Sequence, residues 1–292
     1  MRYVLDDVAP EPEPSAECRP SARYAAELRR ELSERNIRWA RKKGFAHELS
    51  LSAVPVVLYR EQDECHGNFY PAAYRRIQQN PQWRHRLKKV HTTARKVLLS
   101  RDTGRCELDS SSSSDALLMS IFCHPHALSQ GSRLCSLLAV DAGTEPIFGY
   151  RPGIPLKNGR RDSTEIDLRL GNLLIEAKLT EYDFQTAPGR LVERYRDGEE
   201  VFHLDELPRC GDSFVSYQLI RGALAAYAEP AARFCVMCDA RRPDLIASWY
   251  RILQCVRCPG LNCRLMLVTW QELRRACPDP LQRWLQEKYG IA

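Results

Sequence analysis

The sequence predicts an α/β protein in which helices flank a mixed central β-sheet, preceded by a helical and basic N-terminal extension. Segments with helix and strand periodicity alternate in the second half of the chain, the order expected of a sheet covered by helices. Basic residues gather in a helical pattern before them. The chain has 292 residues, of which 44% are hydrophobic, and can therefore bury a full core. We divide it into residues 1–20, 21–105 and 106–292.

Residues 1–20 are rich in proline and glutamate, and we expect a mobile tail there because so little apolar surface cannot offset the entropy of ordering the chain. Residues 21–45 have helical spacing. Tyr24, Leu28 and Leu32 recur on one side, with arginines and glutamates elsewhere. This pattern predicts one amphipathic helix.

A basic block runs from Arg75 to Arg105, where ten basic residues stand against a single acid, Asp102. Trp83 and Val90 interleave with them, which predicts a helix with a buried stripe and a positive outer face. Such a face binds a phosphate backbone or is merely solvated, and both interpretations stay open. The residues expected to contact nucleic acid are Arg84, Arg86, Lys88, Lys89, Arg95 and Lys96.

Residues 106–292 are predicted to form the core. A helix begins near Asp115, capped by Ser114 or a neighbouring serine. A second short helix follows at 133–140. After them the pattern predicts a strand within 144–156, two strands around a turn at 163–181, a helix at 214–230, a strand at 232–240, a helix at 243–256, a strand at 264–270 and a helix at 281–290.

The segment 164–178 predicts a β-hairpin, because Gly171-Asn172 is a two-residue turn between two apolar runs. A two-residue turn fixes the register, so Asp167 should face Glu176. One face of the hairpin then carries Glu165, Asp167, Glu176 and Lys178. The other face is wholly apolar and is formed by Ile166, Leu168, Leu170, Leu173, Ile175 and Ala177.

Two opposed carboxylates on a hairpin repel each other, so Asp167 and Glu176 call for a cation between them. Carboxylate oxygens suit Mg²⁺ or Mn²⁺, with water and substrate phosphate completing the shell. Lys178 on the same face could orient a bound water or offset developing charge, which points to a phosphodiester substrate. The alternative is a half-buried hairpin with a charged solvent face, in which Glu165 and Lys178 form a surface ion pair.

Asp167, eight intervening residues and then Glu176-Ala177-Lys178 resemble the signature of the PD-(D/E)xK nuclease superfamily, and the chain resembles bacterial restriction-endonuclease-like proteins. The resemblance implies a restriction-endonuclease-like core in 106–292, with Asp167 and Glu176 as metal ligands and Lys178 as the catalytic lysine. It also implies a polar residue on the following helix. Gln218 matches the glutamine of many members, whereas Tyr227 lies farther along than the tyrosine of the commonest version.

Many members of the superfamily also place an acid on the helix before the first strand. Glu107, Asp115 and Glu145 are the candidates for this acid. We favour Asp115 as a third metal ligand.

The chain contains 12 cysteines. Cys235 and Cys238 lie three apart in an apolar strand and should point to opposite faces, which favours buried thiols over a zinc site. Cys255, Cys258 and Cys263 surround a Pro-Gly turn that could gather three thiolates. They support the rival hypothesis, a nucleic-acid-binding protein without catalysis that holds zinc or an iron–sulfur cluster.

The sequence therefore predicts a metal-dependent nuclease that hydrolyses DNA with Mg²⁺ or Mn²⁺. No apolar run approaches the ~20 residues that cross a bilayer, and the N-terminus lacks the apolar stretch of an export signal, so we expect a cytoplasmic location without a membrane partner. No phosphate-cradling GxxxxGK occurs, which disfavours nucleotide-driven chemistry. Because cutting both strands of a duplex calls for two active sites, a homodimer is one assembly that this hypothesis allows.

Overall fold

The computed structural model describes residues 19–52, 54–89 and 106–292. The predicted tail, apart from its last two residues, lies outside the described residues. So do residues 90–105 of the basic block, including Arg95 and Lys96.

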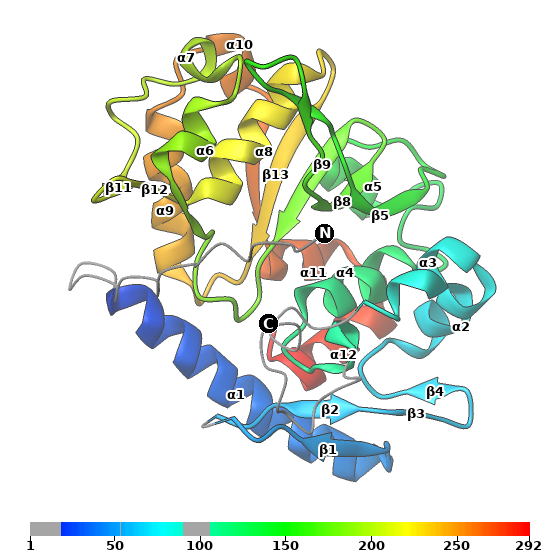
Figure 1. Cartoon of the computed structure of the whole chain (residues 1–292). Helices are drawn as coiled ribbons and strands as arrows, with labels where there is room; N and C mark the ends of the chain where they lie inside the picture. Colours follow the sequence, from blue (N-terminus) through cyan, green and yellow to red (C-terminus); the bar gives the residue numbers. More distant parts are fainter. Residues whose placement is uncertain (1–18, 53, 90–105) are drawn as a thin grey trace, which may run out of the picture.

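The centre of the protein is a five-stranded mixed sheet with the strand order β14-β13-β9-β8-β5 (Figure 1). The pairs β5–β8 and β8–β9 are antiparallel, whereas β9–β13 and β13–β14 are parallel. Helices connect β9 to β13 and β13 to β14, which allows these neighbouring strands to run parallel. A mixed sheet with helical connections confirms the predicted α/β class. The strands are β5 (Pro146–Tyr150), β8 (Ile166–Leu170), β9 (Leu173–Ala177), β13 (Arg233–Cys238) and β14 (Leu265–Thr269).

Helices cover both faces of the sheet (Figure 1). On one face, Leu168 and Ile175 share a core cluster with Leu117 of α4 and Leu273 of α11. Helices on this side are α1 (Arg19–Lys43), α4 (Ser114–Phe122), α5 (Arg133–Leu138), α11 (Trp270–Ala276) and α12 (Asp279–Tyr289).

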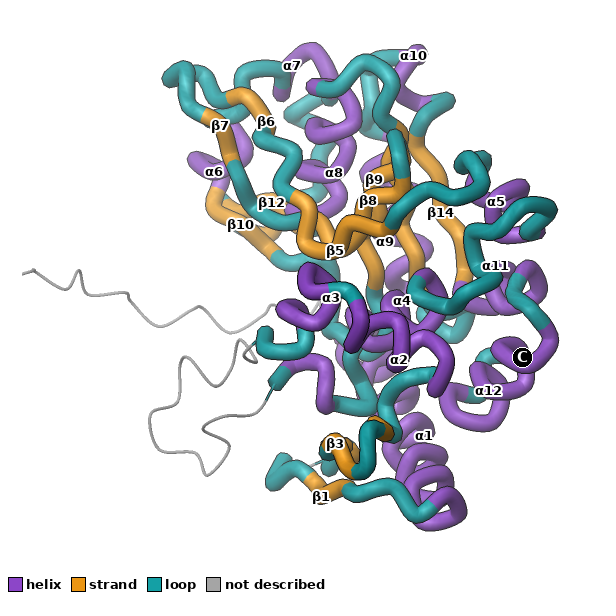
Figure 2. The backbone as a smooth tube through the Cα atoms, turned by 90° about the vertical axis from the view of Figure 1, so that its right-hand side faces the viewer, coloured by secondary structure: helices purple, strands orange, loops and turns teal. Residues whose placement is uncertain are grey.

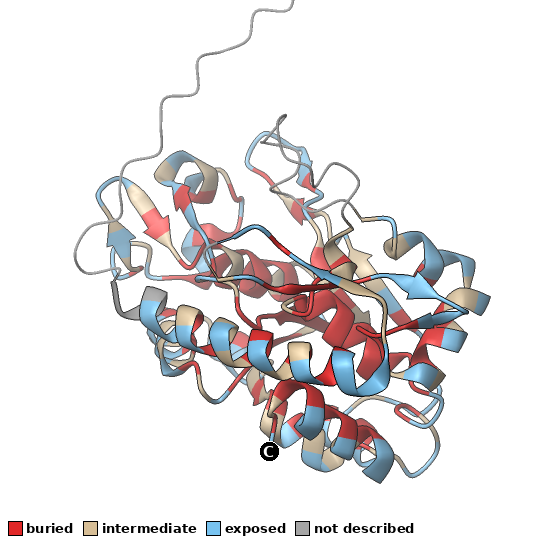
Figure 3. Cartoon of the chain, turned by 90° about the horizontal axis from the view of Figure 1, so that it is seen from below, coloured by how far each residue is buried: buried red, intermediate tan, exposed pale blue. Residues whose placement is uncertain are grey.

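On the other face, Leu174 and Phe234 share a second cluster with Ile220 of α8. Helices on this side are α6 (Gly189–Glu193), α7 (Gly198–Val201), α8 (Tyr217–Ala228), α9 (Pro243–Gln254) and α10 (Pro259–Asn262). Figure 3 shows buried residues in the interior of these layers and exposed residues along the outer helices. No helix among the described residues is long and apolar enough to cross a bilayer.

The hairpin β8–β9 has the predicted register. Leu170 pairs with Leu173, Arg169 with Leu174 and Leu168 with Ile175. Gly171, the first turn residue, has a φ of +57°, which suits glycine at the start of a two-residue hairpin turn.

The prediction was wrong for Ile166, which lies in the cluster on the α8 side rather than with the rest of the apolar face. The β8–β9 ladder ends at the Leu168–Ile175 pair, and Ile166 pairs instead with Tyr150 of β5, which packs against the same α8-side cluster.

The N-terminal segment contains more than helices. Two short hairpins precede α2 (Pro71–Gln79) and α3 (Pro81–Arg86), and Glu107–Asp109 forms a 3-10 turn before α4. The strands of these hairpins are β1 (His47–Leu49), β2 (Val57–Tyr59), β3 (Glu61–Gln62) and β4 (Cys65–His66).

The continuous helix predicted for the basic block is wrong within the described residues. Asn80 separates α2 from α3, and its side chain accepts hydrogen bonds from the backbone N–H groups of Gln82 and Trp83. Helix α3 already ends at Arg86. Trp83 is buried, as the helical pattern indicated.

Residues on both sides of position 105 share one core. Leu28 and Leu32 of α1 and Val57 and Tyr59 of β2 belong to the same cluster as Leu168. The division at residue 105 remains a prediction, but the described part of the N-terminal segment packs directly on the layer that contains α4.

Short strands lie beside α6 and α8. Apart from Ile154–Pro155, which falls within the predicted strand range 144–156, they were not predicted, because two or three residues carry too little periodicity. They are β6 (Ile154–Pro155), β7 (Arg161–Asp162), β10 (Thr186–Pro188), β11 (Arg209–Cys210) and β12 (Ser213–Val215). Figure 2 shows β6, β7, β10 and β12 beside α6 and α8, and it shows α3 and α4 below the strands of the central sheet.

Candidate active site

The candidate site lies where β8 and β9 stop pairing. The backbone N–H of Ala177 donates to Oδ2 of Asp167 at 2.8 Å. The side-chain carboxylate of Asp167, and not a backbone carbonyl of β8, therefore accepts the hydrogen bond beyond the end of the β8–β9 ladder. Burial, together with Glu176 and Asp115, raises the pKa of Asp167 well above its usual value, although Lys178 opposes the shift. The three acids are therefore close enough to interact electrostatically.

Glu176 is almost fully buried and accepts two hydrogen bonds on one oxygen. Nζ of Lys178 donates to Oε1 of Glu176 at 2.8 Å, and Nε2 of Gln218 donates to the same oxygen at 2.6 Å. Residues two apart on a strand share a face, which brings Lys178 to Glu176, while Gln218 reaches them from the first turn of α8. The surface ion pair between Glu165 and Lys178, which belonged to the alternative interpretation of the hairpin, is not formed: Lys178 pairs with Glu176, and Glu165 pairs with Arg86 and Arg151.

Lys178 is 6% exposed and its backbone is fixed on both sides. Its N–H donates to the carbonyl of Met237 at 2.8 Å, and its carbonyl accepts from Nε1 of Trp270 at 2.9 Å. Burial opposes the charged form of Lys178, but Glu176, Asp167 and nearby carboxylates outweigh it and raise its pKa above the usual value. Lys178 is an ammonium ion at neutral pH.

Asp115 lies in the first turn of α4 and is 2% exposed. The side chain of Ser113 caps this helix by accepting from the N–H of Ala116, as the serine run predicted. Oδ2 of Asp115 accepts from Arg86 at 2.9 Å and from Lys89 at 2.9 Å. Burial alone would raise the pKa of Asp115, but the two cations hold it below its usual value.

The basic residues predicted to contact nucleic acid do not share one outer face. Arg86 and Lys89 are partly buried and form ion pairs with acids at the site, whereas Arg84 and Lys88 are exposed. The reason is that α3 ends at Arg86, and the turn after it directs Lys89 back toward α4.

Sequence reasoning missed Arg221, which is 4% exposed and lies three residues after Gln218 on α8. Its Nη2 donates to the carbonyl of Glu165 at 2.8 Å and lies 4.0 Å from Oε2 of Glu176. The spacing of three residues from Gln218 places both side chains on one helix face and was the available signal. Tyr227, in contrast, donates to Glu200 at 2.8 Å.

The loop after Lys178 is anchored by contacts that were also missed. Oε1 of Glu181 accepts from Oγ of Ser114 at 2.6 Å. Arg242 is fully buried, pairs with Asp244 at 2.7 Å and donates to the carbonyls of Glu181 and Tyr182. These contacts tie the end of β9 to the start of α4 and to α9.

Each of the three acids uses one carboxylate oxygen for hydrogen bonds and keeps the other without a hydrogen-bond donor among the described residues. The oxygens left over are Oδ1 of Asp167, Oε2 of Glu176 and Oδ1 of Asp115. Oδ1 of Asp115 is buried as well. A buried carboxylate oxygen without a donor, such as Oδ1 of Asp115, is suited to a bound cation or water.

Within the described ranges, no group of three or more His, Cys, Asp or Glu side chains is placed to hold a metal ion. Mg²⁺ typically binds through one or two carboxylates together with water and substrate phosphate, so Asp167 and Glu176 are a sufficient pair. The late cysteines are not gathered into such a group either. Sγ of Cys255 donates to the carbonyls of Glu206 and Arg251, which is the behaviour of a thiol.

Cys235 and Cys238 are buried free thiols in β13, as predicted. Burial raises the pKa of Cys238 to about 12. Cys235 and Cys238 lie in the core clusters on opposite faces of the sheet, so their side chains are not placed to share one metal ion.

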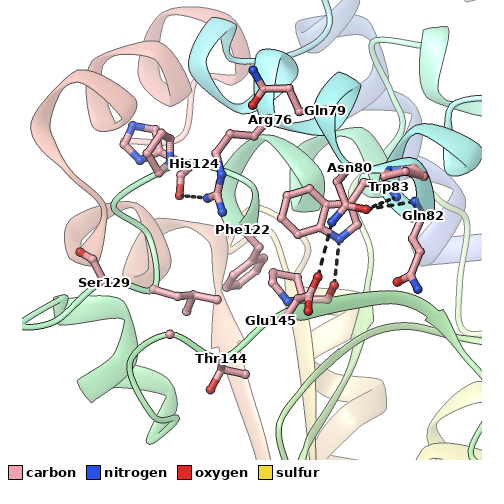
Figure 4. Close-up of a pocket in the computed structure, with 15 residues that line it drawn as sticks. Arg76, Gln79, Asn80, Gln82, Trp83, Phe122, His124, Ser129, Thr144 and Glu145 are labelled. Atoms are coloured by element: carbon pink, nitrogen blue, oxygen red, sulfur yellow. Dashed lines mark hydrogen bonds between the residues drawn. The ribbon is translucent and has the colours of Figure 1, made fainter.

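A pocket of about 930 Å³ lies near the other end of α4 (Figure 4). Two of its polar side chains are already paired: Arg76 donates to the carbonyls of Cys123 and His124, and Trp83 donates to the carbonyl of Pro146. Neither Asp167 nor Glu176 lines it. This pocket is separate from the candidate active site.

The mixed sheet with helices on both faces defines a restriction-endonuclease-like α/β protein. The family model described as restriction endonuclease associating with ARP (REase-ARP) matches residues 20–290, and the chain belongs to this family. This match confirms the resemblance found in the sequence. No curated protein and no solved structure matches the chain significantly.

Proposed function

We propose that this protein is a metal-dependent nuclease that hydrolyses phosphodiester bonds of DNA, acting as an endonuclease of restriction or repair type. The observation that carries the proposal is the convergence of Asp167, Glu176 and Lys178 at the open end of the β8–β9 hairpin, with Gln218 bonded to the same glutamate. Membership in a family of restriction endonucleases supports the reaction class.

Asp167 and Glu176 would hold Mg²⁺ or Mn²⁺. Among the described residues, Asp115 does not form a metal-binding group of three with them, so it would have to move toward the ion to act as a third ligand. The carboxylate oxygens without donors fit this role, because hard oxygen ligands are what these ions prefer. When bound, the ion supplies Lewis-acid polarisation of the phosphoryl group and lowers the pKa of a coordinated water.

The protein's own residues perform three tasks. Lys178 stays protonated, so it acts as a hydrogen-bond donor that orients the attacking water or stabilises charge on the phosphate, and not as a general base. Gln218 fixes the orientation of Glu176. Arg221 anchors the strand that carries Asp167 through the carbonyl of Glu165.

The substrate assignment rests on chemistry and on the family. A net charge of +6 and the exposed Arg84 and Lys88 favour a polyanion, so binding should weaken as salt rises. The proposal includes action in the cytoplasm and, for cutting of both strands, a homodimer. The family's description names association with ARP, so the proposal includes ARP as a partner.

The proposal is tested by incubating circular and linear duplex DNA with wild-type protein and with Glu176→Gln, in Mg²⁺, Mn²⁺ or chelator. We expect the wild type to cut circular DNA only with metal and the variant to have lost this activity. Metal analysis of the purified protein distinguishes the nuclease from the rival hypothesis. Tightly bound stoichiometric zinc or iron would favour the cysteine-metal binding protein, whereas a requirement for weakly held Mg²⁺ or Mn²⁺ would favour the nuclease.

A further inference from the structure

We propose that Arg86 and Arg151 form a phosphodiester-binding subsite beside the catalytic acids, and that Glu165 occupies the place of a substrate phosphate until DNA binds. This inference rests on the proposed nuclease function and names how the substrate backbone enters the site.

Glu165 bridges the two arginines with its two oxygens. Nη1 of Arg86 donates to Oε2 at 3.0 Å, and Nη2 of Arg151 donates to Oε1 at 3.3 Å. A phosphodiester also presents two non-bridging oxygens and a single negative charge, and arginine recognises carboxylate and phosphate through the same planar set of donors. A backbone phosphate can therefore replace the Glu165 carboxylate between the two guanidinium groups.

The position of Glu165 ties this subsite to the candidate metal ligands. Glu165 lies two residues before Asp167, and its carbonyl accepts from Arg221, which also approaches Glu176. Arg86 in addition pairs with Asp115 at 2.9 Å. A phosphate held here would lie next to the acids that we propose bind the metal.

The contact is open enough to be exchanged. The side chain of Glu165 is 37% exposed and that of Arg151 is 63% exposed. Glu165 is the only acid paired with Arg151 among the described residues. Exposed ion pairs contribute little to stability, so an incoming phosphate displaces Glu165 from Arg151 with little opposition from the fold.

The backbone of β5 is shaped to admit this cluster. Gly149 has a φ of +66°, and a Cβ atom built there would lie 2.2 Å from Nη1 of Arg86 and 3.2 Å from Oε2 of Glu165. Glycine leaves room for the arginine–carboxylate pair against the strand. Arg86 also has a buried Nε without a hydrogen-bond partner, so Asp115 and Glu165 together do not satisfy all of its donors.

The test is DNA binding, measured by fluorescence anisotropy with a labelled duplex in chelator, where cutting does not interfere. For Glu165→Gln we expect the dissociation constant to fall about three- to tenfold. The slope of the logarithm of affinity against the logarithm of salt concentration should become steeper by about one, which corresponds to one more counterion released. For Arg151→Gln we expect changes of similar size in the opposite direction. The double variant, with Glu165→Gln and Arg151→Gln together, should lose most of the gain in DNA affinity that Glu165→Gln produces alone.

A matched control is the exposed pair of Arg23 and Glu27 on α1, joined at 2.8 Å. Glu27→Gln makes the same change in net charge, so general electrostatics alone would make it bind as Glu165→Gln does. Thermal melting of each variant checks that it is folded, and Arg151→Gln, an exposed site, tests the subsite even if Glu165→Gln is unstable.

Unchanged or weaker binding by folded Glu165→Gln, or equal effects of Glu27→Gln, would overturn the subsite. In that case metal-dependent cutting by the wild type would still uphold the nuclease proposal. If the wild type neither binds nor cuts DNA, both proposals fall together.

Discussion

Asp167→Asn is expected to stabilise the metal-free protein while abolishing its stabilisation by metal. The carboxylate of Asp167 interacts unfavourably with Glu176 and Asp115, and Lys178 offsets only part of this repulsion. Two carboxylates about 5 Å apart repel by roughly 3 kcal/mol at an effective dielectric constant of about 20. Asparagine keeps an oxygen for the N–H of Ala177 and removes the charge.

After compensation by Lys178, we expect a net gain of about 1–2 kcal/mol at neutral pH, or a rise of roughly 2–4 °C in Tm. Because the pKa of Asp167 is raised in the folded state, ionisation of this group costs stability as pH rises from about 4 toward the folded-state pKa. The difference between variant and wild type should therefore grow over that range and vanish at lower pH.

The assay is thermal melting in chelator and across a Mg²⁺ titration, with Asp141→Asn, an exposed aspartate, as the control. A ligand at about 100 times its dissociation constant stabilises the protein that binds it by roughly 2.7 kcal/mol. The wild type and the control should show such a Mg²⁺-dependent rise, and Asp167→Asn should not. Destabilisation of Asp167→Asn in chelator, or an equal response to Mg²⁺, would refute the reasoning.

Three further outcomes are expected. Gln218→Ala removes a donor to Glu176 and should raise the Mg²⁺ concentration for half-maximal cleavage about 10–100-fold; an unchanged Mg²⁺ titration would contradict this. Arg242→Ala leaves Asp244 buried and unpaired and should cost about 3–5 kcal/mol in urea unfolding, whereas a loss below about 1 kcal/mol would argue against the anchor. Lys288 of α12 is fully buried, and this burial holds its pKa well below the usual value, so wild-type stability should fall as pH drops below about 10, by up to roughly 1.4 kcal/mol per pH unit. Lys288→Met should lack this slope, and parallel pH profiles of the two proteins would contradict the prediction.

The parts of the structure that follow from local patterns could be predicted from the sequence. The Gly171-Asn172 turn fixes the register of the β8–β9 hairpin, and the register alone places Asp167, Glu176 and Lys178 near one another. Gln218 lies in the first turn of a helix with clear periodicity and was predicted to join them.

The parts that depend on distant contacts could not. Arg86 was assigned to an outer face because its neighbours in sequence are basic, yet it pairs with Asp115 and Glu165, 29 and 79 residues away. The anchoring of the loop after Lys178 by Arg242 is equally remote in sequence. The break between α2 and α3 did have a local signal, since Asn80-Pro81 is a dipeptide that marks turns.

The most direct test of the central claim is the single-turnover rate of duplex DNA cleavage in Mg²⁺ by wild-type protein, Lys178→Ala and Lys157→Ala. Lys157 is a matched control because it is 53% exposed and pairs with Glu199 at 3.6 Å. Removing one preorganised donor at a site of charge development typically costs about 100–1,000-fold in rate. We predict a loss of this size for folded, DNA-binding Lys178→Ala and a wild-type rate for Lys157→Ala; cleavage by Lys178→Ala at the wild-type rate would contradict the assignment of Asp167, Glu176 and Lys178 as the catalytic centre.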